Sequence, residues 1–135
     1  MSATRDLATL LRDMTPVLAS STYVFCCIVS DRLPLGVDVL CQFREAEGLT
    51  AIIEQSDAER LGIKYDFVAR MITLAVHSDL AAIGFLSHIA ATLAHAGIAC
   101  NVVSAYHHDH LFVPASRAEE ALSLLRALAV SSAIV

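Results

Sequence analysis

Residues 72–84 read ITLAVHSDLAAIG, and residues 97–114 read GIACNVVSAYHHDHLFVP. The apolar run at 71–76 is short enough for a strand and too short for a core helix. Ser78 can cap a helix and Asp79 complements its dipole, so a helix is predicted from Ser78 to the stop at Gly97. The second stretch predicts a strand at 98–106, a turn at 107–109 and a returning strand at 111–113, closed by Pro114.

Working outward, the flanking segments complete this pattern. A final helix is predicted at 115–128, where apolar residues recur at helical spacing, and an edge strand at 129–135. The second half thus reads β-α-β-β-α with a last β, which is the ferredoxin-like order.

The first half repeats parts of this pattern. It predicts a short helix at 4–14, a buried strand at 23–29, and a hairpin of strands at 37–43 and 49–54 around Gly48. Ser56 is predicted to cap a helix that Gly62 ends. A leading strand and long helix before Tyr23 are missing. The fold class is therefore α+β, with halves at 1–65 and 66–135, each an antiparallel sheet covered by helices on one face.

Composition limits the partners. The chain has 135 residues, a hydrophobic fraction of 56%, a charged fraction of 17% and a net charge of −5. So much apolar surface predicts a homo-oligomer, and the sparse basic residues argue against nucleic acid and a membrane surface as partners.

The N-terminus and the cysteines indicate the compartment. Arg5, Asp6, Arg12 and Asp13 interrupt the apolar core that a secretion signal needs. Cys26, Cys27 and Cys100 lie inside apolar β-like runs, with Cys41 in another, and are interpreted as reduced core thiols. The uncharged stretch 80–108 is broken by histidines and Gly97, which argues against a membrane span. The expected location is the cytoplasm.

Both quoted stretches resemble a family of small bacterial tandem-ACT proteins. The resemblance rests on the strand ending in Val-His-Ser, the Tyr-His-His-Asp-His hairpin, and the matching segments 23–25 and 43–50 of the first half. It implies two ferredoxin-like (ACT-type, βαββαβ) halves and a regulatory protein that binds a small molecule, since similar domains, such as those of the CASTOR arginine sensors, bind amino acids.

The hairpin and the predicted helix start should meet at one edge of the sheet, because the first and third strands of a ferredoxin-like sheet are neighbours. Backbone N–H groups and Ser78 would hold a ligand carboxylate, and Asp109 an ammonium group. The predicted ligand-binding residues are His77, Ser78, Asp79, Asn101, Tyr106, His108, Asp109 and His110.

Other interpretations of this edge stay open. His107, His108 and His110 carry atoms that suit zinc or iron, but without a standard ligand spacing no metal is predicted. The hairpin could instead be a solvated turn in which Asp109 bonds its own backbone. A scaffold without a ligand is a further alternative. Catalysis by His77 with Asp109 is disfavoured, since nucleophile and phosphate-loop motifs are missing, and no cofactor is expected. His88 and His95 are interpreted as surface or interface residues.

Overall fold

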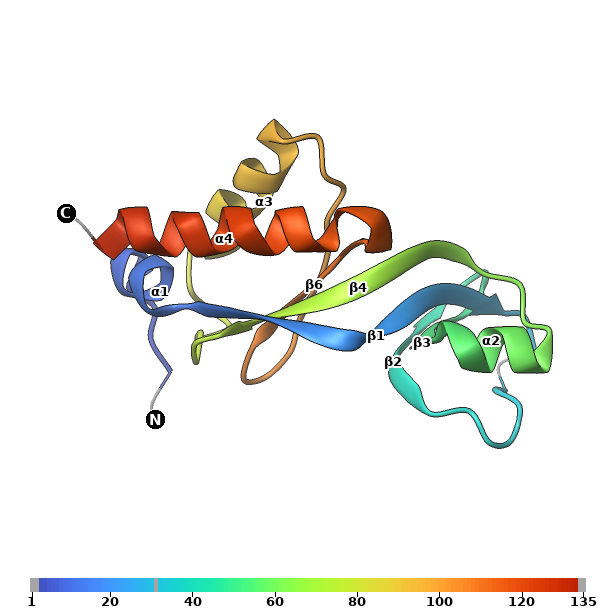
Figure 1. Cartoon of the computed structure of the whole chain (residues 1–135). Helices are drawn as coiled ribbons and strands as arrows, with labels where there is room; N and C mark the ends of the chain where they lie inside the picture. Colours follow the sequence, from blue (N-terminus) through green and yellow to red (C-terminus); the bar gives the residue numbers. More distant parts are fainter. Residues whose placement is uncertain (1–2, 31, 134–135) are drawn as a thin grey trace. The chain divides into compact units, whose positions relative to one another are not determined.

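The computed structural model describes residues 3–30 and 32–133, and they form an α+β protein, as predicted (Figure 1). The chain divides into two compact units. The first combines the segment up to Ala19 with the segment from Met71 onward, and the second is Ser20–Arg70. Strands β1 (Thr15–Ile28) and β4 (Asp66–Ala75) contain residues of both units.

The sheet of the first unit has the strand order β4-β6-β5 and carries helices on one face (Figure 1). Besides the start of β1 and the end of β4, its elements are α1 (Leu7–Asp13), α3 (Phe85–His95), β5 (Asn101–Ser104), β6 (Asp109–Pro114), a 3-10 turn (Ala115–Arg117) and α4 (Ala118–Ala133). Strands β5 and β6 are antiparallel, with Asn101 opposite Phe112 and Ser104 opposite Asp109. The predicted hairpin is therefore confirmed.

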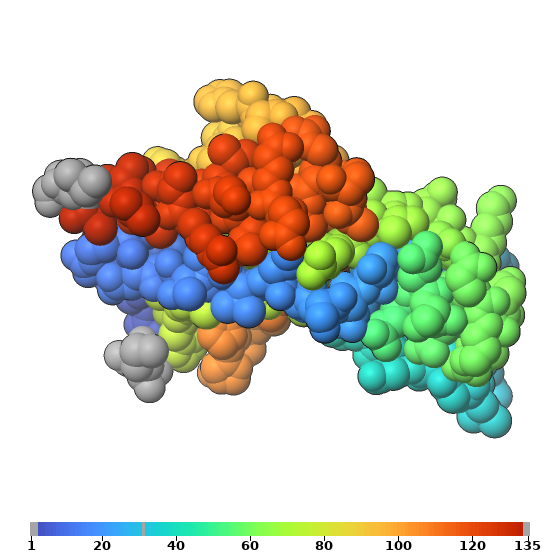
Figure 2. All heavy atoms as spheres, viewed as in Figure 1, coloured from blue at the N-terminus to red at the C-terminus, as the bar shows by residue number. Residues whose placement is uncertain are grey.

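The core of this unit lies between the sheet and its helices. Alternate strand residues point toward the helices, and helix residues three or four positions apart point back. Fully buried members are Ile72 and Leu74 of β4, Leu111 and Val113 of β6, Ile89 and Leu93 of α3, Leu125 of α4 and Leu10 of α1. The atoms of α4 lie directly against those of α1 (Figure 2).

The helix predicted from Ser78 begins at Phe85 instead. Gly84 is its N-cap, with a positive φ of 89° that glycine adopts without strain. Ser78 forms a parallel bridge with Thr4, which engages the backbone on both sides of Ser78 and keeps it extended. Leu80 and Ile83, predicted on the apolar helix face, are 66% and 86% exposed in the connecting loop.

The C-terminal prediction of an edge strand is also wrong for the described residues. Helix α4 continues to Ala133, and Leu128 and Ala129 pack on the core. The hydroxyls of Ser131 and Ser132 donate to the Leu128 carbonyl, which leaves these serines compatible with the helix. Residues 134–135 of the predicted strand lie outside the described residues.

The second unit has the antiparallel strand order β2-β3-β1. Its further elements are β2 (Val39–Glu45), β3 (Gly48–Glu54) and α2 (Gln55–Leu61). A smaller core is formed by Val24, Cys26, Ala51, Ile53 and Ala58. The hairpin turns at Gly48, whose φ of 152° is positive, and α2 ends at Gly62 with φ 66°, both as predicted.

Two local predictions in the N-terminal half are wrong. Strand β1 begins at Thr15 rather than near Tyr23, because residues 15–22, with their polar side chains, still pair in a sheet. Helix α2 is preceded by Glu54 as N-cap, so Ser56 lies inside the helix and forms no capping box.

The cysteines divide between the two faces of a strand. Cys26 is buried, whereas the adjacent Cys27 is exposed, because neighbouring strand residues point to opposite faces. The interpretation of Cys27 as a core thiol is therefore wrong. Cys41 and Cys100 are half-buried, and all four thiols are free.

Within 3–30 and 32–133, the helices are too short or too polar to cross a membrane.

Candidate functional site

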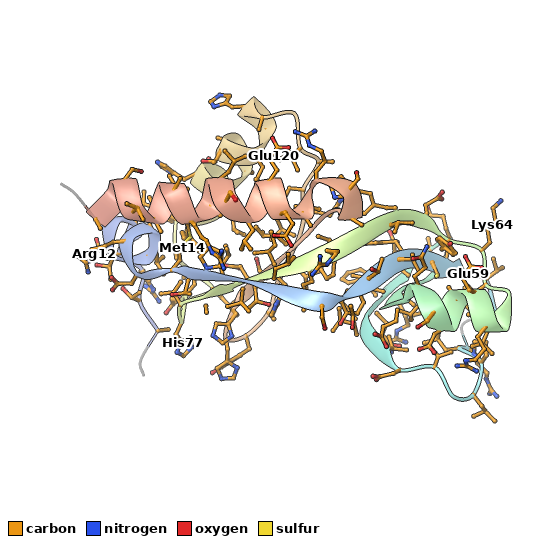
Figure 3. The ribbon with its side chains drawn as sticks, in the orientation of Figure 1. Arg12, Met14, Glu59, Lys64, His77 and Glu120 are labelled. Atoms are coloured by element: carbon orange, nitrogen blue, oxygen red, sulfur yellow. The ribbon has the colours of Figure 1, made fainter. Side chains whose placement is uncertain are left out.

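The loop between β4 and α3 is held in place by the N-terminal segment. The Thr4 N–H donates to the His77 carbonyl at 3.0 Å, and the Asp79 N–H donates to the Thr4 carbonyl at 3.0 Å. His77 lies just past the end of β4 (Figure 3). These bonds fix Ser78 and Asp79 beside the β5–β6 hairpin, where a cavity opens.

A cavity of about 120 Å³ lies between this loop, the first turn of α3 and the hairpin. Ser78, Asp79 and Asp109 line it together with Ser104 and residues 84–87. Ser78 is 8% exposed and Asp109 6% exposed, so two polar side chains are withdrawn from bulk water at this point.

Asp109 is a largely buried acid in the cavity wall, only 6% exposed. Among the described residues, no ion pair to its carboxylate is found, and the adjacent His110 is a basic side chain on which its charge acts. Buried side-chain oxygens without a hydrogen-bond partner are likewise not found in the described part of the chain. The Asp109 carboxylate is therefore an acceptor for a cationic or hydrogen-bond-donating group inside the cavity.

The start of α3 brings partial positive charge to the same cavity. Gly84 has no side chain and makes no capping hydrogen bond, so the first-turn N–H groups, which lack intrahelical acceptors, border the cavity uncapped. Helix N-termini carry a partial positive charge and favour anions. The cavity thus presents a carboxylate and an anion-binding helix end together.

Asp79 is already engaged. Its carboxylate accepts the Ala81 N–H at 2.7 Å and lies 3.3 Å from the Arg5 guanidinium. The Ala81 hydrogen bond, followed by the charge of Arg5, lowers the pKa of Asp79 below its usual range. This acid therefore stays ionised and paired.

A second cavity of about 330 Å³ adjoins the first. Its wall consists of Ala3, His77, Ser78, Asp79, Leu80 and Tyr106, and it shares Ser78, Asp79 and Leu80 with the smaller cavity. Every residue of both walls belongs to the first unit.

The histidines form a row of ring contacts beside these cavities. The rings of His77 and His107 lie 5.3 Å apart between centroids, those of His107 and His108 6.3 Å, and those of His108 and His110 6.4 Å. Among the described residues, groups of three or more side chains arranged to hold a metal ion are not found.

The His110 side chain contacts Thr73. Its Nδ1 lies 2.9 Å from the Thr73 hydroxyl on the neighbouring strand β4. Burial lowers the pKa of His110, and the nearby His108 lowers it further, while Asp109 acts in the opposite direction.

The predicted residues are thus only partly brought together. His77, Ser78, Asp79, Tyr106 and Asp109 line the two cavities, whereas His108 and His110 are absent from both walls. Asn101 is exposed at the opposite end of the hairpin, paired with Phe112.

Sequence reasoning missed the true helix start. The repeat of Phe85, Ile89 and Leu93 at intervals of four after a glycine was the available signal. The contribution of Ala3 and Arg5 had no local signal, because it depends on the long-range bridge of Thr4 to Ser78.

The first unit is a sheet with helices on one face, as in a ferredoxin-like domain, and the second unit combines three antiparallel strands with one short helix. Family models described as ACT domain match residues 2–70 and residues 67–127. The chain belongs to the ACT-domain family and carries two such domains, a type of regulatory domain that typically binds small molecules such as amino acids.

Solved structures agree with this assignment. A Vibrio cholerae protein of unknown function, described as a possible transport protein, has 39% identity and a TM-score of 0.81, covering 91% of this chain and 95% of its own. An Agrobacterium tumefaciens protein has 18% identity and a TM-score of 0.71, covering 86% and 89%. The ligand-free regulatory subunit of aspartate kinase from Thermus thermophilus has 10% identity and a TM-score of 0.63, covering 87% and 97%. The last two show the fold alone. No curated protein matches the sequence.

Proposed function

We propose that this protein is a regulatory sensor that binds an α-amino acid in the cavity between Asp109 and the start of α3. The observation that carries the proposal is the largely buried Asp109 carboxylate, 6% exposed, in a cavity that the uncapped end of α3 also lines. A zwitterion matches both features, with its ammonium group on Asp109 and its carboxylate on the helix N-terminus. The Ser78 hydroxyl would add a hydrogen bond.

The family supports this proposal. ACT domains are regulatory domains, and one structural neighbour is the regulatory subunit of aspartate kinase, an enzyme whose name refers to an amino acid.

The test is a thermal-shift screen with L-amino acids. At a ligand concentration of about 100 times Kd, binding to the folded state adds about 2.7 kcal/mol, which raises Tm by several degrees. The same screen with Asp109→Asn is expected to show no shift, whereas Asp66→Asn, an exposed acid in β4, should respond like the wild type. If no amino acid raises Tm, the proposal fails and a scaffold that binds a protein partner becomes the better account.

We further propose that the chain self-associates. Large apolar side chains such as Val17, Phe43 and Val130 are 50%, 70% and 63% exposed, and an interface between copies of the chain would cover apolar surface of this kind. Light scattering at tens of micromolar protein should give a mass above the 14.5 kDa of one chain; a mass equal to one chain contradicts self-association.

The expected setting is the cytoplasm. Four free cysteines support this proposal, because exposed thiols such as Cys27 persist in a reducing compartment.

A further inference from the structure

The two adjoining cavities of the first unit differ in size and in character. The smaller one, about 120 Å³, is below the roughly 300–1,000 Å³ of ordinary small-molecule sites, so it can hold only the charged end of an amino acid. The larger one, about 330 Å³, reaches that range. Because the two share Ser78, Asp79 and Leu80, a ligand anchored in the smaller cavity extends into the larger one.

The wall of the larger cavity is suited to an uncharged group. Ala3, Leu80 and Tyr106 contribute apolar surface. Its one carboxylate, that of Asp79, is paired with Arg5 at 3.3 Å and accepts the Ala81 N–H at 2.7 Å. A cationic side chain of the ligand would compete with Arg5 for Asp79, and an anionic one would compete with Asp79 for Arg5.

Two wall residues are unusually exposed for their type. Leu80 is 66% exposed and Tyr106 is 74% exposed, although each lines the cavity. Tyr106 is also fixed by an edge-to-face contact with His107, at 4.9 Å between centroids. A bulky apolar or aromatic group in the cavity would cover both side chains and gain from their removal from water.

We propose that the larger cavity selects α-amino acids with a bulky uncharged side chain, which lies against Leu80 and Tyr106. This inference rests on the proposed function, since it requires the amino and carboxylate groups to occupy the smaller cavity. Leu80 and Tyr106 determine specificity, whereas Asp109 and the start of α3 determine that an amino acid binds at all.

The experiment is calorimetry with four probes, L-phenylalanine, L-leucine, glycine and L-lysine, on the full chain. L-Phenylalanine and L-leucine are expected to bind about tenfold or more tightly than glycine, the scale of a lost methylene or more in an apolar pocket, and more tightly than L-lysine. Tyr106→Ala should weaken the two large probes several-fold and leave glycine unchanged, whereas Leu80→Ala, at a position that lines both cavities, should weaken the large probes more than glycine.

Ile83→Ala is the matched control. Ile83 is 86% exposed in the same loop but lines neither cavity, so its replacement should leave all affinities unchanged. The variants are exposed and should keep the wild-type Tm. Selectivity is overturned if glycine or L-lysine binds as tightly as L-phenylalanine, or if Leu80→Ala and Tyr106→Ala bind like Ile83→Ala. If no probe binds, the proposed function fails together with it.

Discussion

Each unit has a cavity with acidic residues in its wall, yet the two differ in what surrounds the acids. In the second unit, Ser21, Tyr23, Asp38, Val39, Leu40 and Glu54 line about 300 Å³. Asp38 is exposed and Glu54 half-buried, whereas Asp109 in the first unit is 6% exposed. Exposed acids are solvated by water, so the largely buried Asp109 has more to gain from a ligand's ammonium group than Asp38 or Glu54.

The helices next to these cavities differ in the charge at their N-termini. Glu54 is the N-cap of α2 and places a negative charge at that helix start, but Gly84 leaves the start of α3 without one. A helix N-terminus that already has its own anion has less to gain from a ligand. We therefore propose the cavity of the first unit as the binding site, because a largely buried carboxylate and an uncapped helix N-terminus both line it.

The core of the first unit offers the largest expected effect. Leu74 is fully buried in β4, so Leu74→Ala should lower the free energy of unfolding by about 2–5 kcal/mol. Leu40→Ala, at a 43% exposed position in β2, should change it by no more than about 0.5 kcal/mol. Urea denaturation measures both, and equal losses would contradict the difference expected between the buried and the exposed position.

A smaller loss of stability is expected from a substitution in the turn at Gly48 of the second unit. A Cβ at Gly48 would lie 3.0 Å from the Cys27 Sγ and 3.0 Å from the Ile28 carbonyl oxygen, at φ 152°. Gly48→Ala should therefore cost about 1–3 kcal/mol. Gly36→Ala, at φ 87° with open space around it, should cost less, because only backbone strain is added. A smaller loss at Gly48 than at Gly36 would contradict this account.

The smallest effect concerns pH. Because burial and His108 lower the pKa of His110, the unfolded chain takes up a proton near pH 6.5 and the folded chain only at lower pH. Stability from neutral His110 is thus complete above about pH 7 and is lost as pH falls through about 6.5.

His110→Gln tests this, since glutamine can keep the bond to Thr73 without titrating. Its Tm should fall less between pH 7 and pH 5.5 than that of the wild type. His95→Gln, at an exposed position near the end of α3, is the control and should keep the wild-type profile. An unchanged pH profile in His110→Gln would remove His110 as the cause.

The sequence predicts those parts of the molecule whose signals are local. The hairpin predicted at 98–106 and 111–113, the turn at Gly48 and the helix stop at Gly62 depend on neighbouring residues. The structure contains the turn and the stop, and it places the hairpin strands at Asn101–Ser104 and Asp109–Pro114. Of the predicted ligand-binding residues, Asp109 and Ser78 line the smaller cavity, and their role in binding stays a prediction.

The missed features depend on contacts far along the chain. The Ser78 hydroxyl has the chemistry of a helix cap. However, Thr4 forms backbone hydrogen bonds with His77 and Asp79, on either side of Ser78, and this bridge keeps the segment extended. Residues 15–22 contain Pro16 and several hydroxyl side chains, so their strand is not visible before its partners are known. The boundary between residues 65 and 66 stays a prediction.

The most direct test of the central claim is calorimetry of Asp109→Asn beside Asp38→Asn, titrated with L-phenylalanine and with the L-amino acid that raises Tm most. Asn keeps the shape of Asp109 and removes its charge, so the account predicts an affinity loss of about 100-fold or more with the fold retained. Asp38→Asn, in the cavity of the second unit, should bind like the wild type. Wild-type affinity in Asp109→Asn, or an equal loss in Asp38→Asn, would contradict the claim that the first unit holds the site.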